Sequence, residues 1–274
     1  MDDDGQNNRR ILIRLTLTID DGKVHADFDG SAEQVAGNIN CPLSVTVAGV
    51  YYAFRCLMPD YTPACDGAFR LIAVSAPTGS LLNACYPAAV AAGNVETSTR
   101  VVDVTLGALA AAVPESIPAA SHGSMNNVAM GHHSSTSSWH YYETIGGGMG
   151  AGAKGDGLSA VQTHMTNTLN TPVEVVETHY PVRIMEYSIR RGSGGSGKHR
   201  GGDGIVRSFQ MLQPAHVSLL TERRDFPPWG INNGDAGAVG INLINSCPVK
   251  AKLQTFLQAG DILTIMTPGG GGYG

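Results

Sequence analysis

Alternating hydrophobic and polar residues predict a β-hairpin near the start of the chain. From Ile11 to Ile19 every second residue is aliphatic, which gives a strand one apolar face. Asp21-Gly22 has the composition of a tight turn, and the alternation resumes over residues 24–28. We therefore predict a two-stranded hairpin over residues 11–29.

Two helices are predicted farther along the chain. Residues 43–57 lie between Pro42, which suits a first helical turn, and Pro59, which ends the helix. The second helix lies between Asn94, a suitable N-cap, and Pro114. Its apolar residues recur at spacings of four, three and four and share one face: Val102, Leu106, Leu109 and Val113. Small residues surround this stripe, so we expect a core helix that is buried on more than one side.

From about residue 118 the pattern changes to β-like runs separated by glycine-rich segments. The β-like runs are residues 139–145, 173–190, 205–212, 216–222 and 250–267. The glycine-rich segments are residues 146–148, 192–204, 230–240 and 269–274. Short strands joined by glycine turns are typical of sandwiches and barrels, and the lack of strand–helix alternation disfavours a doubly wound nucleotide fold.

The predicted fold class is therefore α+β. Residues 1–117 form a helical and mixed amino-terminal part, which packs on a glycine-rich, mainly antiparallel β sandwich or barrel-like part over residues 118–274. We expect both parts to belong to one domain.

Composition narrows the class of protein. Hydrophobic residues make up 42% of the chain, which suffices for a sizeable core. Glycine is unusually frequent, at 35 of 274 residues, and its runs indicate tight turns and close backbone approaches. The net charge is −5 without an evident basic face, which argues against nucleic-acid binding.

The location of the protein follows from what the sequence lacks and from its cysteines. No apolar run approaches the ~18 residues of a membrane span, and the first residues do not resemble a signal peptide. Five cysteines without a CxxC pair indicate reduced thiols that pack as small hydrophobic side chains. We therefore expect a cytoplasmic protein.

One glycine run has the spacing of a phosphate-binding loop. Gly192 and Gly197-Lys198 match the pattern G-x-x-x-x-G-K, but His199 stands where that pattern needs Ser or Thr. A strand-like run follows instead of a helix, so the helix N-terminus that would face a phosphate is missing. We predict a turn between two strands here rather than a nucleotide site.

Two carboxylates and one polar loop are candidates for chemistry. Glu143 and Asp156 flank residues 146–152, where a carboxylate serves either as a general base or metal ligand, or as a cap for backbone N–H groups. His164 lies within residues 163–170, where polar side chains dominate. Such a run either satisfies its own hydrogen bonds or lines a polar pocket.

Other histidines and two arginines leave alternatives open. His122 and His132-His133, the pair lying in an exposed serine-rich loop, lack the spacing of metal ligands, so we expect structural roles. Arg223-Arg224 either clamps a carboxylate or belongs to a solvated charge cluster with Glu222 and Asp225.

The order of several motifs resembles the hydantoinase B/oxoprolinase family. In the first half these motifs are residues 27–31, 37–40, 88–98 and 123–127. The most specific are residues 142–151, 156–157 with 164–168, 193–195 with 200–204, and 268–274. The resemblance spans nearly the whole chain, with many motifs in register.

The resemblance implies a component of an ATP-dependent hydrolase of cyclic amides such as hydantoin or oxoproline. In this family an A-type subunit uses ATP to phosphorylate the amide oxygen, and the B-type part completes hydrolysis of the activated ring. Related subunits serve acetone or acetophenone carboxylases, so a carboxylase component is the alternative, and a non-catalytic assembly fragment is a third. The expected partners are an A-type subunit and the amino-terminal half of a B-type subunit, in a hetero-oligomer.

The candidate site residues come from these polar segments. The catalytic candidates are Glu143, His164 and Asp156, of which Glu143 or His164 would move the proton of the attacking water. The substrate-binding candidates are Asn126, Asn127, Asn167 and Asn170, whose amides would hold the ring carbonyl or its phosphorylated oxygen.

The chain departs from the family at its start. Longer members carry an Asn-Asp-Pro segment, then Gly-Gly-Thr-His and a nearby Asp, which resembles a metal-binding segment; this sequence has none, so a divalent ion would be held by that other half. Residues 1–5 resemble an internal acidic segment of longer members. We therefore expect the carboxy-terminal half of a B-type subunit that is inactive alone. Asn232-Asn233 replaces a usual glycine pair, and Ala84-Cys85 lies where an Arg is common.

Overall fold

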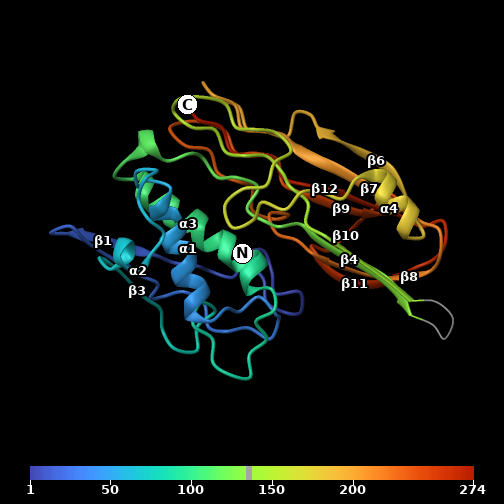
Figure 1. Ribbon diagram of the computed structural model, residues 1–274, viewed down its shortest axis with the longest axis horizontal. Coiled ribbons are helices and arrows are strands. Elements are labelled where there is room, and N and C mark those ends of the chain that lie inside the picture. The colour runs from blue at the N-terminus through green and yellow to red at the C-terminus, as the bar shows by residue number, and fades with distance from the viewer. Residues whose placement is uncertain (134–137) are drawn as a thin grey trace. The chain divides into compact units, whose positions relative to one another are not determined.

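The computed structural model describes residues 1–133 and 138–274, and within it the chain forms two compact units, Met1–Pro118 and Ala119–Gly274 (Figure 1). Each unit has its own sheets, and helices are concentrated in the first. The α+β class with mainly antiparallel sheets is confirmed.

The first unit contains the predicted hairpin. Strands β1 (Thr16–Asp20) and β2 (Lys23–Asp27) pair antiparallel, and β3 (Ile72–Ser75) pairs parallel to β2. Asp21 and Gly22 have φ angles of 45° and 72° at the turn, which is why a short polar residue and glycine occur there. The hairpin is confirmed, although its strands begin later than the alternation does.

Two packed helices complete this unit. Helix α1 (Leu43–Arg55) follows Pro42 as predicted, and α3 (Ser98–Ala110) contacts it. The approach is close because a Cβ on Gly49 would lie only 2.9 Å from a Val101 methyl carbon. Smaller elements are α2 (Asp66–Phe69), a π-helical turn η1 (Gly93–Thr97) and a 3-10 turn η2 (Pro114–Ser116).

The start of the second helix was predicted wrongly. Asn94 lies inside the π-helical turn rather than at an N-cap, and α3 begins only at Ser98. The predicted burial on more than one side is confirmed, because apolar and polar residues around α3 are both buried. Val113 lies beyond the helix and is exposed.

The second unit is a two-sheet sandwich (Figure 1). The five-stranded sheet has the order β10-β9-β12-β7-β6 and consists of β6 (Val182–Arg190), β7 (Gly204–Met211), β9 (Ile241–Ile244), β10 (Cys247–Val249) and β12 (Ile262–Met266). The four-stranded sheet has the order β11-β8-β4-β5 and consists of β4 (Asn127–His133), β5 (Ser138–Glu143), β8 (Ala215–Leu220) and β11 (Lys252–Leu257).

A single apolar core fills the space between these sheets. Val128 and Tyr141 contribute from the four-stranded sheet, and Phe209 and Leu263 from the five-stranded one. The Tyr141 and Phe209 rings meet across the gap, with centroids 6.5 Å apart. Strands of this kind bury every second side chain, so any polar residue in the same register lies inside the sandwich.

Two elements of this unit differ from the prediction. Residues 173–179 form helix α4 (Val173–His179) rather than strand, because Pro172 starts a helical turn that packs against β6. His132-His133 ends strand β4 instead of lying in a loop, and the serine-rich residues 134–137 lie outside the described part of the chain.

The glycine-rich segments are mostly not turns. Their backbones pack directly against other backbone: a Cβ on Gly148 would lie 1.9 Å from the Gly202 carbonyl oxygen, and one on Gly270 2.1 Å from that of Met149. Among the glycines of these fully described segments, Gly192 alone has a positive φ. The prediction of close approaches is confirmed, whereas the prediction of glycine turns holds for little of their length.

Candidate functional site

A buried ion pair between Glu143 and Arg207 lies inside the sandwich. Glu143 ends β5 in register with the inward-facing Tyr141, and Arg207 lies on β7 between inward-facing Ile205 and Phe209. Arg207 Nε and Nη2 each donate to one carboxylate oxygen, both at 3.2 Å, in a bidentate arrangement. The side chains of Arg207 and Glu143 are 0% and 3% exposed, so this pair joins the two sheets out of contact with solvent.

The same pair holds residue 171. Thr171 N–H donates to Glu143 Oε1 at 3.1 Å, and Arg207 Nη2 donates to the Thr171 carbonyl at 3.2 Å. Next to it, Asn170 Nδ2 donates to the Thr144 carbonyl at 2.9 Å. Burial raises the pKa of Tyr141 to about 12, with its hydroxyl near Thr171 and Glu143. The cluster therefore fixes the chain at the carboxyl end of the polar residues 163–170.

A second polar cluster surrounds Asn126. Its Nδ2 donates to the carbonyl oxygens of Ser124 and Ile145, at 3.4 and 3.1 Å. Its Oδ1 accepts a hydrogen bond of 2.6 Å from Arg224 Nη1, and Arg224 Nη2 donates to Asn242. Asn126 has a φ of 45°, a conformation that asparagine tolerates well. The Asn126 side-chain amide thus donates both of its hydrogen atoms to backbone carbonyl oxygens.

Asn127 is held by both neighbouring strands, β5 and β8. Its Oδ1 accepts a 2.6 Å hydrogen bond from the Tyr142 hydroxyl, and its Nδ2 donates to the Leu220 carbonyl at 3.4 Å. Asn126, Asn127 and Asn170 therefore all bind at or beside residues 142–145. The structure brings these three predicted residues together with Glu143.

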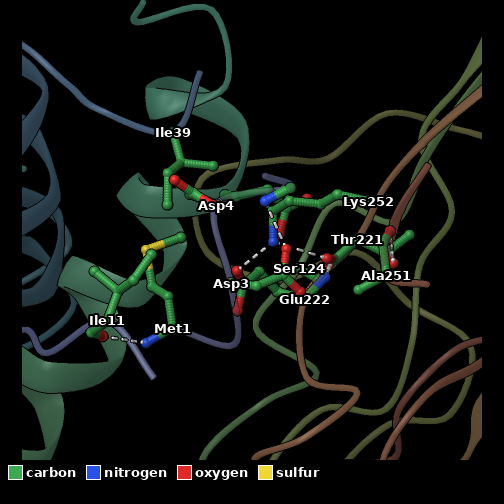
Figure 2. A network of polar contacts seen from close by, with 12 residues as sticks. Met1, Asp3, Asp4, Ile11, Ile39, Ser124, Thr221, Glu222, Ala251 and Lys252 are labelled. Carbon is green, nitrogen blue, oxygen red and sulfur yellow. Dashed lines mark hydrogen bonds and ion pairs between the residues drawn. The ribbon is translucent and has the colours of Figure 1, made fainter. Parts of the chain in front are cut away.

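Lys252 and Glu222 form a second buried ion pair, which Figure 2 shows. Lys252 Nζ lies 2.7 Å from Glu222 Oε1 and 3.3 Å from the Thr221 carbonyl oxygen. Glu222 N–H donates to the Ser124 hydroxyl at 3.0 Å. Because Glu222 and Arg223 are buried, the alternative of a solvated charge cluster is wrong for them.

The other predicted site residues lie apart from this centre. Asp156 is exposed; its Oδ1 accepts from the Arg200 N–H at 2.8 Å and lies 3.6 Å from His199 Nδ1. His164 is half-buried with a φ of 61°, and Asn167 is exposed on the same polar segment. The sequence did not single out Arg207, Asn242 or Lys252. Arg207 lies between apolar Ile205 and Phe209 on β7, and Asn242 interrupts the apolar strand β9, whereas Lys252 only begins β11.

Several histidines gather on the outer face of the four-stranded sheet. A hollow of about 400 Å³ lies there, lined by residues that include His132, His133, His140 and His216. His140 leans over β4, since a Cβ on Gly131 would lie 2.9 Å from its Nδ1. His122, in contrast, is buried near the glycine-rich segments, where its N–H donates to the Gly148 carbonyl.

The glycine run 192–204, which has the spacing of a phosphate-binding loop, is not arranged to bind a nucleotide. It connects antiparallel strands β6 and β7, as predicted. Its N–H groups are used inside the fold: Gly194 donates to Asp203 Oδ1, Gly195 to the Gly270 carbonyl and His199 to that of Tyr273. A phosphate cradle needs such N–H groups to converge on the ligand.

The described residues contain neither a metal-binding cluster nor a membrane span. Among them, no group of three or more His, Cys, Asp or Glu side chains is placed to hold a metal ion. No helix in the same ranges has the length and apolar character to cross a membrane. Of the cysteines, Cys41 is buried and the other four are exposed, so the expectation of packed thiols holds for Cys41 alone.

Comparison with known proteins gives a consistent family. The chain is 42% identical over 96% of its length to 5-oxoprolinase 1 of Arabidopsis thaliana, covering 20% of that protein. It is 31% identical over its whole length to the B-type subunit of a putative D-/L-hydantoinase from Pseudomonas sp. strain NS671, covering 48% of it. An uncharacterized protein of Methanocaldococcus jannaschii is 44% identical over 97% of this chain, which covers 47% of that protein. The chain thus spans about half the length of these last two relatives.

Solved structures share the fold. The ATP-dependent caprolactamase from Pseudomonas jessenii matches with a TM-score of 0.86 and 25% identity, over 100% of this chain and 50% of that one. A nucleotide-free acetone carboxylase matches with a TM-score of 0.77 and 16% identity, over 95% of this chain and 41% of that one, which concerns the fold alone. The sequence profile of hydantoinase B/oxoprolinase matches residues 1–274. The chain belongs to the hydantoinase B/oxoprolinase family.

Proposed function

We propose that this chain is a component of an ATP-dependent cyclic-amide hydrolase that opens a hydantoin or oxoproline ring. One observation carries the proposal: a relative named 5-oxoprolinase and one named as a B-type hydantoinase component align with 96% and 100% of the chain, at 42% and 31% identity. A carboxylase role has weaker support, because the likeness to acetone carboxylase is 16% in sequence.

In the proposed reaction, a partner of the A type transfers the γ-phosphoryl group of ATP to the amide oxygen. An unstrained amide is a poor electrophile, and phosphorylation turns its oxygen into a leaving group. Water then adds to the ring carbon, and the C–N bond breaks to give the ring-opened amine with an acyl phosphate. A second water hydrolyses the acyl phosphate to the carboxylate and inorganic phosphate. The glycine run 192–204 uses its N–H groups inside the fold, which supports assigning ATP to the partner. Any divalent metal is assigned to the remaining half of the B-type subunit.

The residues of this chain have distinct proposed roles. Asn126, Asn127 and Asn170 hold residues 142–145, and Glu143 holds Thr171, so these four shape the wall of the site. His164 and Asn167 lie on the segment that this wall supports, and we assign them to contact with the ring.

Asp156 is assigned to proton transfer on a different basis. Its carboxylate is 68% exposed beside His199 Nδ1, at 3.6 Å, and is therefore accessible to water. Asp156→Asn in the complete enzyme is expected to lower ring opening about 100-fold. Unchanged turnover in that variant would remove Asp156 from the site.

The test of the function is product analysis. This chain is combined with an A-type subunit and the remaining half of a B-type subunit, and supplied with ATP, bicarbonate and either oxoproline, hydantoin or acetone. The proposal predicts ring-opened acids from a cyclic amide and no carboxylated ketone. A β-keto acid from acetone, without ring opening, would favour the carboxylase. No product from any substrate, in a mixture whose parts associate, would favour an assembly role.

A further inference from the structure

Residues 163–169 form a closed loop. Gln162 Nε2 donates to the Thr144 carbonyl at 3.4 Å, and Asn170 Nδ2 donates to the same oxygen at 2.9 Å. The residues that flank the loop therefore meet at one backbone group on the wall of the sandwich. Compact loops with adjacent ends on a rigid scaffold commonly carry binding or catalytic residues.

The carboxyl end of the closed loop is fixed by the buried ion pair. Glu143 accepts from the Thr171 N–H at 3.1 Å, and Arg207 donates to the Thr171 carbonyl at 3.2 Å. Both backbone groups of one residue are thus held by two opposite charges that also bind each other. Hydrogen bonds with an ionised partner are stronger than neutral ones, and the bidentate fork adds geometric specificity.

Tyr187 provides a second link between Arg207 and the end of the closed loop. It lies opposite Arg207 in the pairing of β6 with β7, and its ring centroid is 4.2 Å from the guanidinium carbon. Its hydroxyl donates to Asn170 Oδ1 at 3.2 Å. The half-exposed Tyr187 ring therefore packs over the buried Arg207 guanidinium, and its hydroxyl binds Asn170 at the end of the loop. The position of Arg207 is thereby coupled to that of Asn170.

The Glu143–Arg207 pair reaches beyond the two sheets that it joins. Both residues direct further hydrogen bonds at Thr171, which lies outside both sheets. Within the closed loop, residues 167–169 are exposed, with Leu169 at 91%. An exposed segment held by a fixed base suits a loop that contacts a ligand.

We infer that Arg207 is a positioning residue of the proposed hydrolase: with Glu143 it fixes the closed loop so that His164 and Asn167 face the reacting ring. This inference rests on the proposed function. It adds a residue that acts through the loop and contacts neither ring nor phosphate.

Hydrogen–deuterium exchange on the intact chain tests the anchoring without any substrate. Arg207→Lys keeps the charge but loses the fork that binds carboxylate and Thr171 together, and Tyr187→Phe keeps the ring but loses the hydroxyl on Asn170. We expect amides of residues 163–171 to exchange about tenfold faster in Arg207→Lys and by a smaller factor in Tyr187→Phe. Tyr180→Phe, the same change on a ring that packs against Tyr141, should leave the loop as in the wild type.

Unchanged exchange of the loop amides in both variants would overturn the inference. An acceleration of the β8 amides as large as that of the loop amides would overturn it as well. If Arg207→Lys does not fold, Tyr187→Phe decides alone: faster exchange confined to the loop supports the anchor, and wild-type exchange overturns it.

Turnover of the complete enzyme separates positioning from stability. Below the melting temperature of each variant, Arg207→Lys is expected to lower kcat for ring opening at least about tenfold. Val217→Ala, a core truncation on β8 away from the loop, should keep the wild-type kcat while lowering the melting temperature. Equal kcat in both variants would make Arg207 merely structural. A wild-type enzyme that opens no cyclic amide would refute the proposed function, whereas the exchange result stands by itself.

Discussion

The substitution Glu143→Gln is the most severe test of the ion pair inside the sandwich. The substitution leaves the Arg207 guanidinium, which is 0% exposed, without its counter-charge. Removing one partner of a buried pair costs about 3–5 kcal/mol, because the other charge stays buried. Gln retains one oxygen for the Thr171 N–H, so we expect the lower end, about 3 kcal/mol. For a chain of this size that lowers Tm by about 6–12 °C.

Urea unfolding followed by circular dichroism measures this loss as a lower midpoint at constant slope. Glu186→Gln, an exposed carboxylate on β6, is the control and should change stability by less than about 0.5 kcal/mol. Glu143→Leu combined with Arg207→Met removes both charges and should recover much of the loss. A loss below about 1 kcal/mol in Glu143→Gln would refute the claim that the pair is buried and bidentate.

Three further predictions concern packing and reactivity. Gly202→Ala should cost about 3 kcal/mol, because its Cβ would lie 1.9 Å from a carbonyl oxygen, whereas Gly152→Ala meets nothing within 4 Å and should be neutral; equal melting temperatures would contradict this. Burial raises the pKa of Cys41 to about 11, so mass spectrometry should find it unlabelled by a thiol reagent at pH 8 while exposed cysteines react, and rapid labelling of Cys41 would count against its burial. Asn126→Ala loses three side-chain hydrogen bonds and leaves alanine at a φ of 45°, which should cost about 2–4 kcal/mol in urea unfolding; a neutral result would contradict the role of its amide.

Local periodicity accounts for what the sequence predicted well. The hairpin before β3 and helices α1 and α3 each have a repeat of two or near 3.6, and each is bounded by residues that break it. The prediction failed for α4, whose three valines favour a strand, because β-branched preference is weak against a proline-initiated turn packed on β6.

The glycine-rich segments show a different limit. Glycine indicates either a turn or a close approach, and the sequence alone does not separate the two. Which carbonyl oxygen lies over Gly148, Gly202 or Gly270 depends on segments more than forty residues away in the chain. Only the folded arrangement shows that these runs pack against one another.

The candidate site was half predictable for a related reason. Glu143 and Asn170 stand out as polar residues shortly before a glycine run and a proline, and the structure brings them together through Thr144 and Thr171. Arg207 left a trace in the sequence, as a charge at an inward position between Ile205 and Phe209. Its partner could not be inferred, because the pair joins two sheets across 64 residues of sequence.

The central claim is that this chain is required for an ATP-dependent ring opening, and a dropout experiment tests it most directly. Oxoproline and hydantoin are incubated with ATP, an A-type subunit and the remaining half of a B-type subunit, with and without this chain, and both ring-opened acid and phosphate are quantified. The account predicts ring-opened acid only when the chain is present, with one phosphate released per ring. Equal ring opening without the chain, or phosphate release that never yields an opened ring in its presence, would contradict it.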